Sequence, residues 1–158
     1  MWQVGATHGL TTEHQALVAY VAKNISFTEE LNRQQQQQQQ QVLQQHHNTI
    51  FLCVQDADRL DAIGAVGIAR TFTFGAVKNR PFYDRHIAPI ANPTHEQYVT
   101  LCKQSPTINH SSEKLLQLHN MLKTGSGRAM GQQRHAFMQQ FLQQFMDEVG
   151  HSAAPHDW

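Results

Sequence analysis

The sequence carries little charge, and that charge is balanced. Charged residues make up 15% of the 158 residues, and 12 Lys and Arg offset 12 Asp and Glu, so the formal net charge is +0. A surface that binds DNA or RNA needs a concentrated excess of basic residues. We therefore expect no nucleic-acid polymer as a partner.

Long apolar runs are also missing. No stretch of the sequence reaches the roughly 20 apolar residues that span a bilayer. The first residues lack a basic segment followed by an apolar one, which argues against a signal peptide. These features predict a soluble, cytoplasmic protein without a membrane partner.

Cysteine is scarce, and familiar catalytic motifs are absent. Only Cys53 and Cys102 occur, with no Cys-x-x-Cys pair, which argues against a zinc knuckle. We interpret both as reduced, partly buried thiols, with a disulfide as the alternative. There is no nucleophile elbow and no glycine-rich phosphate loop, because Gly125-Ser126-Gly127 is too short and predicts a turn.

Helical periodicity dominates what is present. Apolar residues at helical spacing predict a helix over Thr12–Ile25, with Thr12 and Gln15 as a capping box. Thr94 and Gln97 predict a second capping box. The last helix carries the widest apolar face and ends at Gly150. The members of this face are Met130, Phe137, Met138, Phe141, Leu142, Phe145 and Val149.

The least polar segment predicts a central, buried helix. Apolar and small residues from Ile50 to Ile68 trace one helical face. Gly64 and Gly67 are costly in an isolated helix, so they indicate close packing against another helix or a ligand. No convincing strand pattern occurs, and the predicted class is all-α.

Two segments are predicted to lie outside the packed domain. Residues 34–47 are a glutamine- and histidine-rich tract that has nothing to bury, so we expect a flexible insertion. An interaction or aggregation-prone segment is the alternative for this polyglutamine tract. Residues 151–158 are expected to be a disordered tail, and the His-Asp pair within it is interpreted as a coincidence.

Charged residues cluster inside the predicted central helix. Asp56, Asp58, Arg59 and Asp61 stand within an otherwise apolar stretch. Burial of a carboxylate is costly unless it is paired or binds a cation. One interpretation is an internal ion pair of Arg59 with Asp56 or Asp61. The other is a carboxylate directed at a metal ion.

The string around Asp58 resembles the last metal-ligand motif of the HD-superfamily metal-dependent phosphohydrolases. The likeness extends from about Asn24 to Val149, interrupted by the glutamine tract. This part of the chain is similar to the uncharacterised HD hydrolases of bacteria and fungi. The matching segments are Ala57–Phe72, Gly75–Tyr83, Ser105–His110, Glu113–Leu116, Arg134–Met138 and Phe141–Leu142.

The resemblance implies a helical bundle in which a histidine, a His-Asp pair and a final aspartate bind divalent cations such as Mn²⁺ or Mg²⁺. Some bacterial relatives act as nucleotide pyrophosphohydrolases. By this likeness Asp58 is the metal aspartate, while Asp61 and Arg59 support the site or the fold. The implied partner is a nucleotide or another small phosphoester.

Five further residues are candidate phosphate or substrate contacts. Arg70, Lys78 and Arg80 follow the central helix, and His110 and Lys114 lie one helical turn apart. A solvated loop is the alternative for Lys78 and Arg80. A hydrogen bond at a helix start is the alternative for His110.

The chain departs from the HD pattern in its first third. The histidines before Asp58 are His8, His14, His46 and His47, and none is followed by Asp. We therefore expect an N-terminally truncated, HD-like single domain over 1–158 with little or no phosphohydrolase turnover and a doubtful metal site. The alternative is a non-catalytic, pseudoenzyme-like interaction module. Apolar surface left exposed on the central helix predicts self-association.

Overall fold

The computed structural model describes residues 9–27, 30, 45–102 and 104–150, with only the backbone described for residues 45–48. The α-helices are α1 (Thr12–Asn24), α3 (Gln45–Asp61), α4 (Gly64–Val77), α5 (His95–Gln97), α6 (His110–Glu113) and α7 (Gly125–Glu148). A π-helix, η1 (Tyr98–Cys102), and two 3-10 helices, η2 (Thr107–Asn109) and η3 (Leu115–Met121), connect them. The described residues contain no strand, so the predicted all-α class is confirmed.

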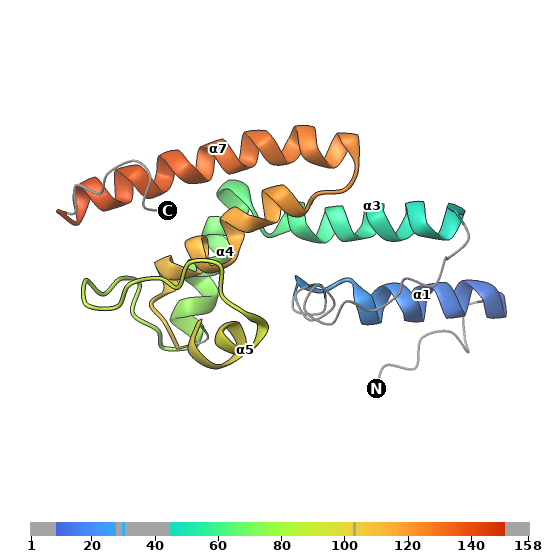
Figure 1. The fold of residues 1–158 in the computed structure, drawn as a ribbon, viewed down its shortest axis with the longest axis horizontal. Coiled ribbons are helices and arrows are strands. Elements are labelled where there is room, and N and C mark those ends of the chain that lie inside the picture. The colour runs from blue at the N-terminus through green and yellow to red at the C-terminus, as the bar shows by residue number, and fades with distance from the viewer. Residues whose placement is uncertain (1–8, 28–29, 31–44, 103, 151–158) are drawn as a thin grey trace.

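Helix α3 lies between α1 and α7, whereas α4 and the short helices form the other end of the molecule (Figure 1). Helix α1 ends one residue before the predicted boundary. Its N-cap is Thr11, whose side chain accepts a hydrogen bond from the His14 backbone at 3.3 Å. The predicted capping box at Thr12 is therefore wrong by one residue, because the helix begins after Thr11.

The predicted single central helix is wrong, because it is broken into α3 and α4. The two helices are bent by 66°. Gly64 begins α4 with a φ of +79°, a conformation that residues with a side chain rarely adopt. The guanidinium of Arg134 from α7 donates to the Leu60 carbonyl at the end of α3. The bend is thus set by a glycine and held by α7.

Asp56 holds α3 against the start of α7. Its Oδ2 accepts from the Thr124 backbone N at 2.7 Å and from Thr124 Oγ1 at 2.8 Å, and its Oδ1 accepts from the Lys123 backbone N at 2.9 Å. Thr124 is the N-cap of α7. A side chain at Gly127 would collide with Asp56 Oδ2. A buried carboxylate therefore satisfies donors at a helix N-terminus, where negative charge is favoured.

Arg59 pairs with Glu30 rather than with Asp56 or Asp61, so both predicted pairings are wrong. The two side chains form an ion pair, and Gln55 Nε2 donates to the same carboxylate at 3.1 Å. Lys123 Nζ reaches the other oxygen of Glu30 at 2.8 Å. Glu30 comes from a distant part of the chain, where helical spacing could not reveal it as a partner.

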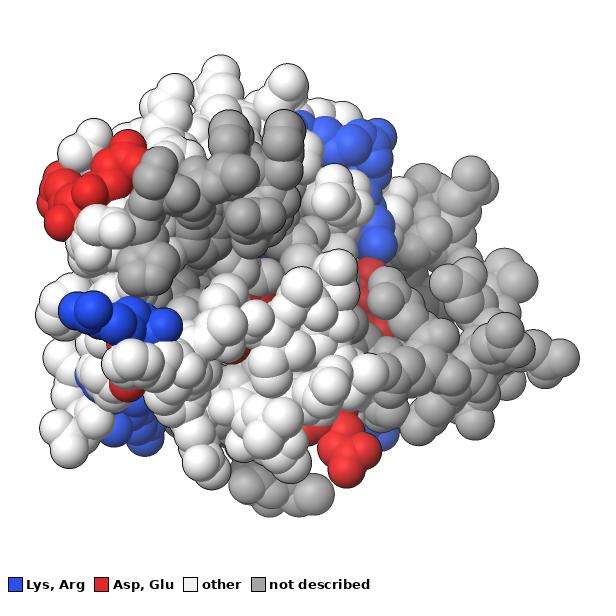
Figure 2. All heavy atoms as spheres, turned by 60° about the vertical axis from the view of Figure 1, so that its left-hand side comes forward, with Lys and Arg blue, Asp and Glu red and all other residues white. Residues whose placement is uncertain are grey.

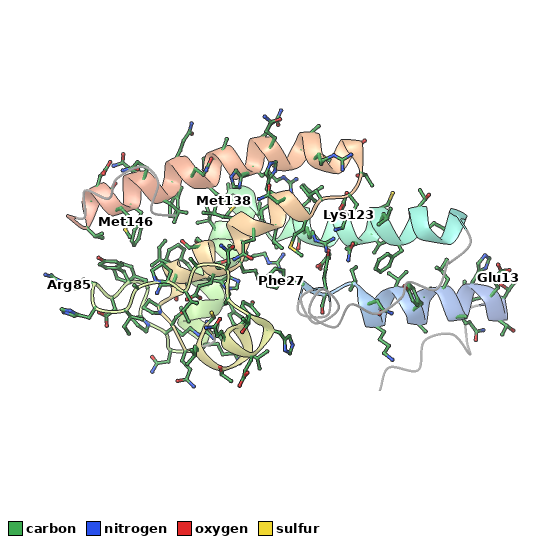
Figure 3. All side chains as sticks on the ribbon, in the orientation of Figure 1. Glu13, Phe27, Arg85, Lys123, Met138 and Met146 are labelled. Carbon is green, nitrogen blue, oxygen red and sulfur yellow. The ribbon has the colours of Figure 1, made fainter. Side chains whose placement is uncertain are left out.

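The hydrophobic core lies between α7, η3 and the α3–α4 bend. Its buried residues are Phe27, Leu60, Ile63, Leu115, Leu118, Leu122 and Met138. Figure 3 shows Met138 and Met146 on the side of α7 that faces the rest of the molecule. The buried stripe of α7 thus follows Met138, Leu142 and Met146, whereas Met130 and Phe137 are each 46% exposed.

The predicted turn at Gly125-Ser126-Gly127 is instead the first turn of α7. The predicted capping box at Thr94 and Gln97 is confirmed. Both cysteines are free, with Cys53 exposed and Cys102 buried. Residues 34–44 of the glutamine tract and residues 151–158 lie outside the described residues, while Gln45–His47 begin α3.

The described charged residues form small separate groups on the face shown in Figure 2, with uncharged surface between them. In the described part of the chain, no single helix is long and apolar enough to cross a membrane. The bent pair of residues 49–61 and 64–77 meets this requirement by length and composition only.

We predict that Asp56→Ala lowers the free energy of unfolding by at least about 3 kcal/mol, because buried backbone donors lose a charged acceptor. Asp58→Ala is the matched control, since Asp58 is an exposed aspartate on the same helix, and should change stability by about 0.5 kcal/mol or less. Urea unfolding followed by circular dichroism measures both. Equal losses in the two variants would contradict the anchoring role of Asp56.

Candidate functional site

A cavity of about 870 Å³ lies beside α4, with η1, η2 and α6 contributing to its wall. All five residues predicted as phosphate or substrate contacts line it. They are Arg70, Lys78, Arg80, His110 and Lys114. Arg70 and Lys114, which are 44 positions apart in sequence, therefore line one space. We refer to this cavity as the cationic cleft.

Close packing of α4 places the cations of the cleft. A side chain at Gly75 would collide with Thr107, so α4 lies directly against η2. The Thr107 backbone N donates to the Pro81 carbonyl at 2.8 Å, and Ile108 N donates to the Phe82 carbonyl at 3.0 Å. These bonds fix the segment that follows Arg80.

Three of the cations contact aromatic rings, and within the described ranges none of these three forms an ion pair with a carboxylate. Lys78 Nζ lies 5.6 Å and Arg80 Cζ lies 6.0 Å from the centre of the Phe74 ring. Lys114 Nζ lies 5.2 Å from the ring centre of Phe27 and 5.9 Å from that of Tyr98. Cation–π contacts of this kind orient a positive charge without neutralising it.

Arg70 differs from the other cations because it has a carboxylate partner. Its guanidinium forms an ion pair with Asp61 and donates to the Asp61 carbonyl at 3.2 Å. Both side chains of this pair are more than half exposed. Asp61 therefore contacts Arg70 at the edge of the cleft, and its role in supporting the site or the fold stays a prediction.

Burial and neighbouring cations set the charge of His110. Burial lowers its pKa to about 4, and the positive charges of Lys114 and Arg80 act in the same direction. His110 is thus a neutral imidazole at neutral pH. Burial also lowers the pKa of Lys114, while Asp58 raises it and Arg70 lowers it further.

Sequence reasoning missed the wall behind the cationic cleft. Glu113 is fully buried, and its carboxylate accepts from Ser105 Oγ at 2.9 Å and from the Ile90 backbone N at 3.5 Å. Burial raises the pKa of Glu113, and burial also raises the pKa of Tyr98 to about 12 and that of Cys102 to about 11. Tyr98 and Cys102 begin and end the π-helix η1, a type of irregularity that often occurs at functional sites.

Asp58 does not lie in a metal-binding cluster of the described residues. Its side chain is exposed on α3, and its charge raises the pKa of Lys114. The described part of the chain contains no group of three His, Cys, Asp or Glu side chains that could hold a metal ion. These residues therefore do not fit the divalent-metal site that the HD resemblance implies.

We predict that acidification destabilises the protein through His110. Because its folded pKa is depressed, its contribution to stability is complete above about pH 6.5 and is lost as pH falls toward about pH 4. Between about pH 7 and pH 5, this loss amounts to about 2 kcal/mol of unfolding free energy. His110→Gln should lose correspondingly less over this interval in urea unfolding. Parallel losses in wild type, His110→Gln and the control His86→Gln would contradict this assignment.

Comparison with known proteins supports an HD-like fold. No protein-family model matches this chain. The chain is 38% identical over 96 residues to the uncharacterised protein YpgQ of Bacillus subtilis, an alignment that covers 61% of this chain and 38% of YpgQ.

Solved structures extend the likeness. A Lactobacillus plantarum protein matches with 34% identity and a TM-score of 0.71, over 89% of this chain and 60% of that protein. An HD-superfamily hydrolase of Bacillus thuringiensis matches with 42% identity and a TM-score of 0.52, over 63% of this chain and 45% of that protein. YpgQ in complex with ADP matches with 30% identity and a TM-score of 0.60, over 90% of this chain and 58% of YpgQ. This chain spans at most 60% of these proteins, and its all-α fold is HD-like.

Proposed function

We propose that this chain is a member of the HD superfamily whose cationic cleft binds a nucleotide or another small phosphoester. The observation that carries the proposal is that all five predicted contacts line a single cavity that offers Lys78, Arg80 and Lys114 to an anion. The binding of ADP by YpgQ, a relative with a similar fold, supports the same ligand class.

Different residues of the cleft would contact different parts of the ligand. Lys78, Arg80 and Lys114 would neutralise phosphate oxygens through charge-assisted hydrogen bonds. Neutral His110 would contribute a hydrogen bond without a fixed charge. Phe74 is 55% exposed and lines the cleft, so its ring offers an apolar face to the rest of the ligand.

We further propose that this chain turns over phosphoesters weakly or not at all. The support is the donor set: among the described residues, Asp58 belongs to no group of three His, Cys, Asp or Glu side chains that could hold a metal ion. The proposed role of Asp58 as a metal ligand therefore depends on residues outside the described ranges, and we assign no catalytic step to it.

A non-catalytic interaction module is the second candidate function. The same donor set favours it, and so do Val66 and Val77 of α4, which line the cleft and are 65% and 75% exposed. Exposed apolar patches promote association, so self-association is part of this candidate. A pure interaction module would have no affinity for ADP in the cleft.

We predict that ADP binds to the purified chain and that Arg80→Gln and Lys114→Gln each weaken binding at least about tenfold in isothermal titration calorimetry. Arg85→Gln is the matched control. Arg85 is an exposed cation at the edge of the molecule (Figure 3) and is not among the residues of the cleft. Equal affinity in all four proteins would place ADP elsewhere, and a lack of affinity in all would favour the interaction module.

Phosphate and pyrophosphate release from nucleotides in the presence of Mn²⁺ tests the proposed lack of turnover. We expect wild type and Asp58→Ala to release product at the same background rate. Strong Mn²⁺-dependent release by wild type that is lost in Asp58→Ala would contradict the proposal and would show that other ligands complete a metal site.

A further inference from the structure

The cationic cleft has an unbalanced set of charges. Among the described residues that line it, no Asp or Glu occurs, whereas Arg70, Lys78, Arg80 and Lys114 are basic. In the described part of the chain, Arg70 is paired with Asp61, but no carboxylate forms an ion pair with Lys78, Arg80 or Lys114. Glu113 and Asp58 act electrostatically on Arg80 and Lys114 but form no ion pair with them. Lys78, Arg80 and Lys114 are therefore available to bind an anion.

The same charges oppose a divalent cation. Mn²⁺ and Mg²⁺ take carboxylate, carbonyl, water or imidazole ligands. Of these ligand types, the described wall offers the imidazole of His110, and the positive charges of Lys114 and Arg80 lower the pKa of that imidazole. A divalent cation bound to His110 would be repelled by Lys114 and Arg80, and this repulsion is stronger in a partly buried site than in water.

Packing also keeps the cations in the cleft before a ligand arrives. The Phe74 ring orients Lys78 and Arg80, and the rings of Phe27 and Tyr98 orient Lys114. Side chains that are already ordered lose less conformational entropy on binding. A chain of phosphates can engage more of these cations than a single phosphate can.

We propose that the cleft binds the metal-free polyphosphate anion of its ligand by direct hydrogen bonds from Lys78, Arg80 and Lys114, with no bridging divalent cation. This inference rests on the proposed nucleotide or phosphoester function and specifies the form of ligand that the site selects. It distinguishes two modes of binding that respond to metal in opposite directions. A bridging metal strengthens binding, whereas direct binding is weakened when metal occupies the phosphate oxygens.

Inorganic triphosphate is the probe, titrated into the full chain by calorimetry at low ionic strength, first in EDTA and then with Mn²⁺ in excess over the triphosphate. We expect binding in EDTA and at least about tenfold weaker binding with Mn²⁺. Stronger binding with Mn²⁺, or binding only with Mn²⁺, would overturn the inference.

Variants titrated in the presence of EDTA test whether triphosphate binds in the cationic cleft. Arg80→Gln and Lys114→Gln should each weaken triphosphate binding at least about tenfold, while Arg85→Gln should bind as wild type does. Circular dichroism checks that each variant is folded, and Lys78→Gln replaces any that is not. Affinity that is unchanged by all cleft variants would overturn the inference, because another surface would then bind the anion.

ADP separates the failure of this inference from that of the proposed function. If ADP binds to the cleft only with Mn²⁺, the inference is wrong and the nucleotide proposal stands. If ADP binds neither with nor without Mn²⁺, both are wrong.

Discussion

The buried carboxylate of Asp56 is the contact on which the arrangement of the long helices depends. It joins the middle of α3 to the first turn of α7, where it accepts hydrogen bonds from Lys123 and Thr124. The ion pair of Arg59 with Glu30 lies one helical turn further along α3. Buried charges of this kind stabilise a fold only when their partners are in place. α3 and α7 therefore adopt one relative position.

That position determines where the cationic cleft forms. Because α7 is fixed at its start, Arg134 reaches the end of α3 and contacts the bend at Gly64. The bend directs α4 toward η2, where Gly75 allows direct contact with Thr107. Lys78 and Arg80 lie just after the end of α4, and Lys114 lies between α6 and η3. Asp56 thus fixes the fold, whereas Asp61 on the same helix contacts Arg70 at the cleft.

Local patterns predicted the parts of the fold that local interactions decide. The helical class and the cap at Thr94 could be predicted from short-range spacing. Arg70, predicted to follow the central helix, instead lies within α4. The pairing of Arg59 with Glu30 could not, because the partners are 29 residues apart and meet only through packing. The break at Gly64 was missed because glycine inside an apolar run is equally typical of close helix packing. The burial of Glu113 was missed because its hydrogen-bond partners Ser105 and Ile90 lie 8 and 23 residues away in sequence.

Nuclear magnetic resonance of the ¹⁵N-labelled chain, titrated with inorganic triphosphate in EDTA, tests the central claim most directly. If the cleft binds the anion through its own cations, amide shifts should change at residues 74–80, 98–102 and 110–115. The amides of Lys123 and Thr124 at the Asp56 junction should change little. Shift changes that are spread over exposed cations outside the cleft, or that require added metal, would contradict the account.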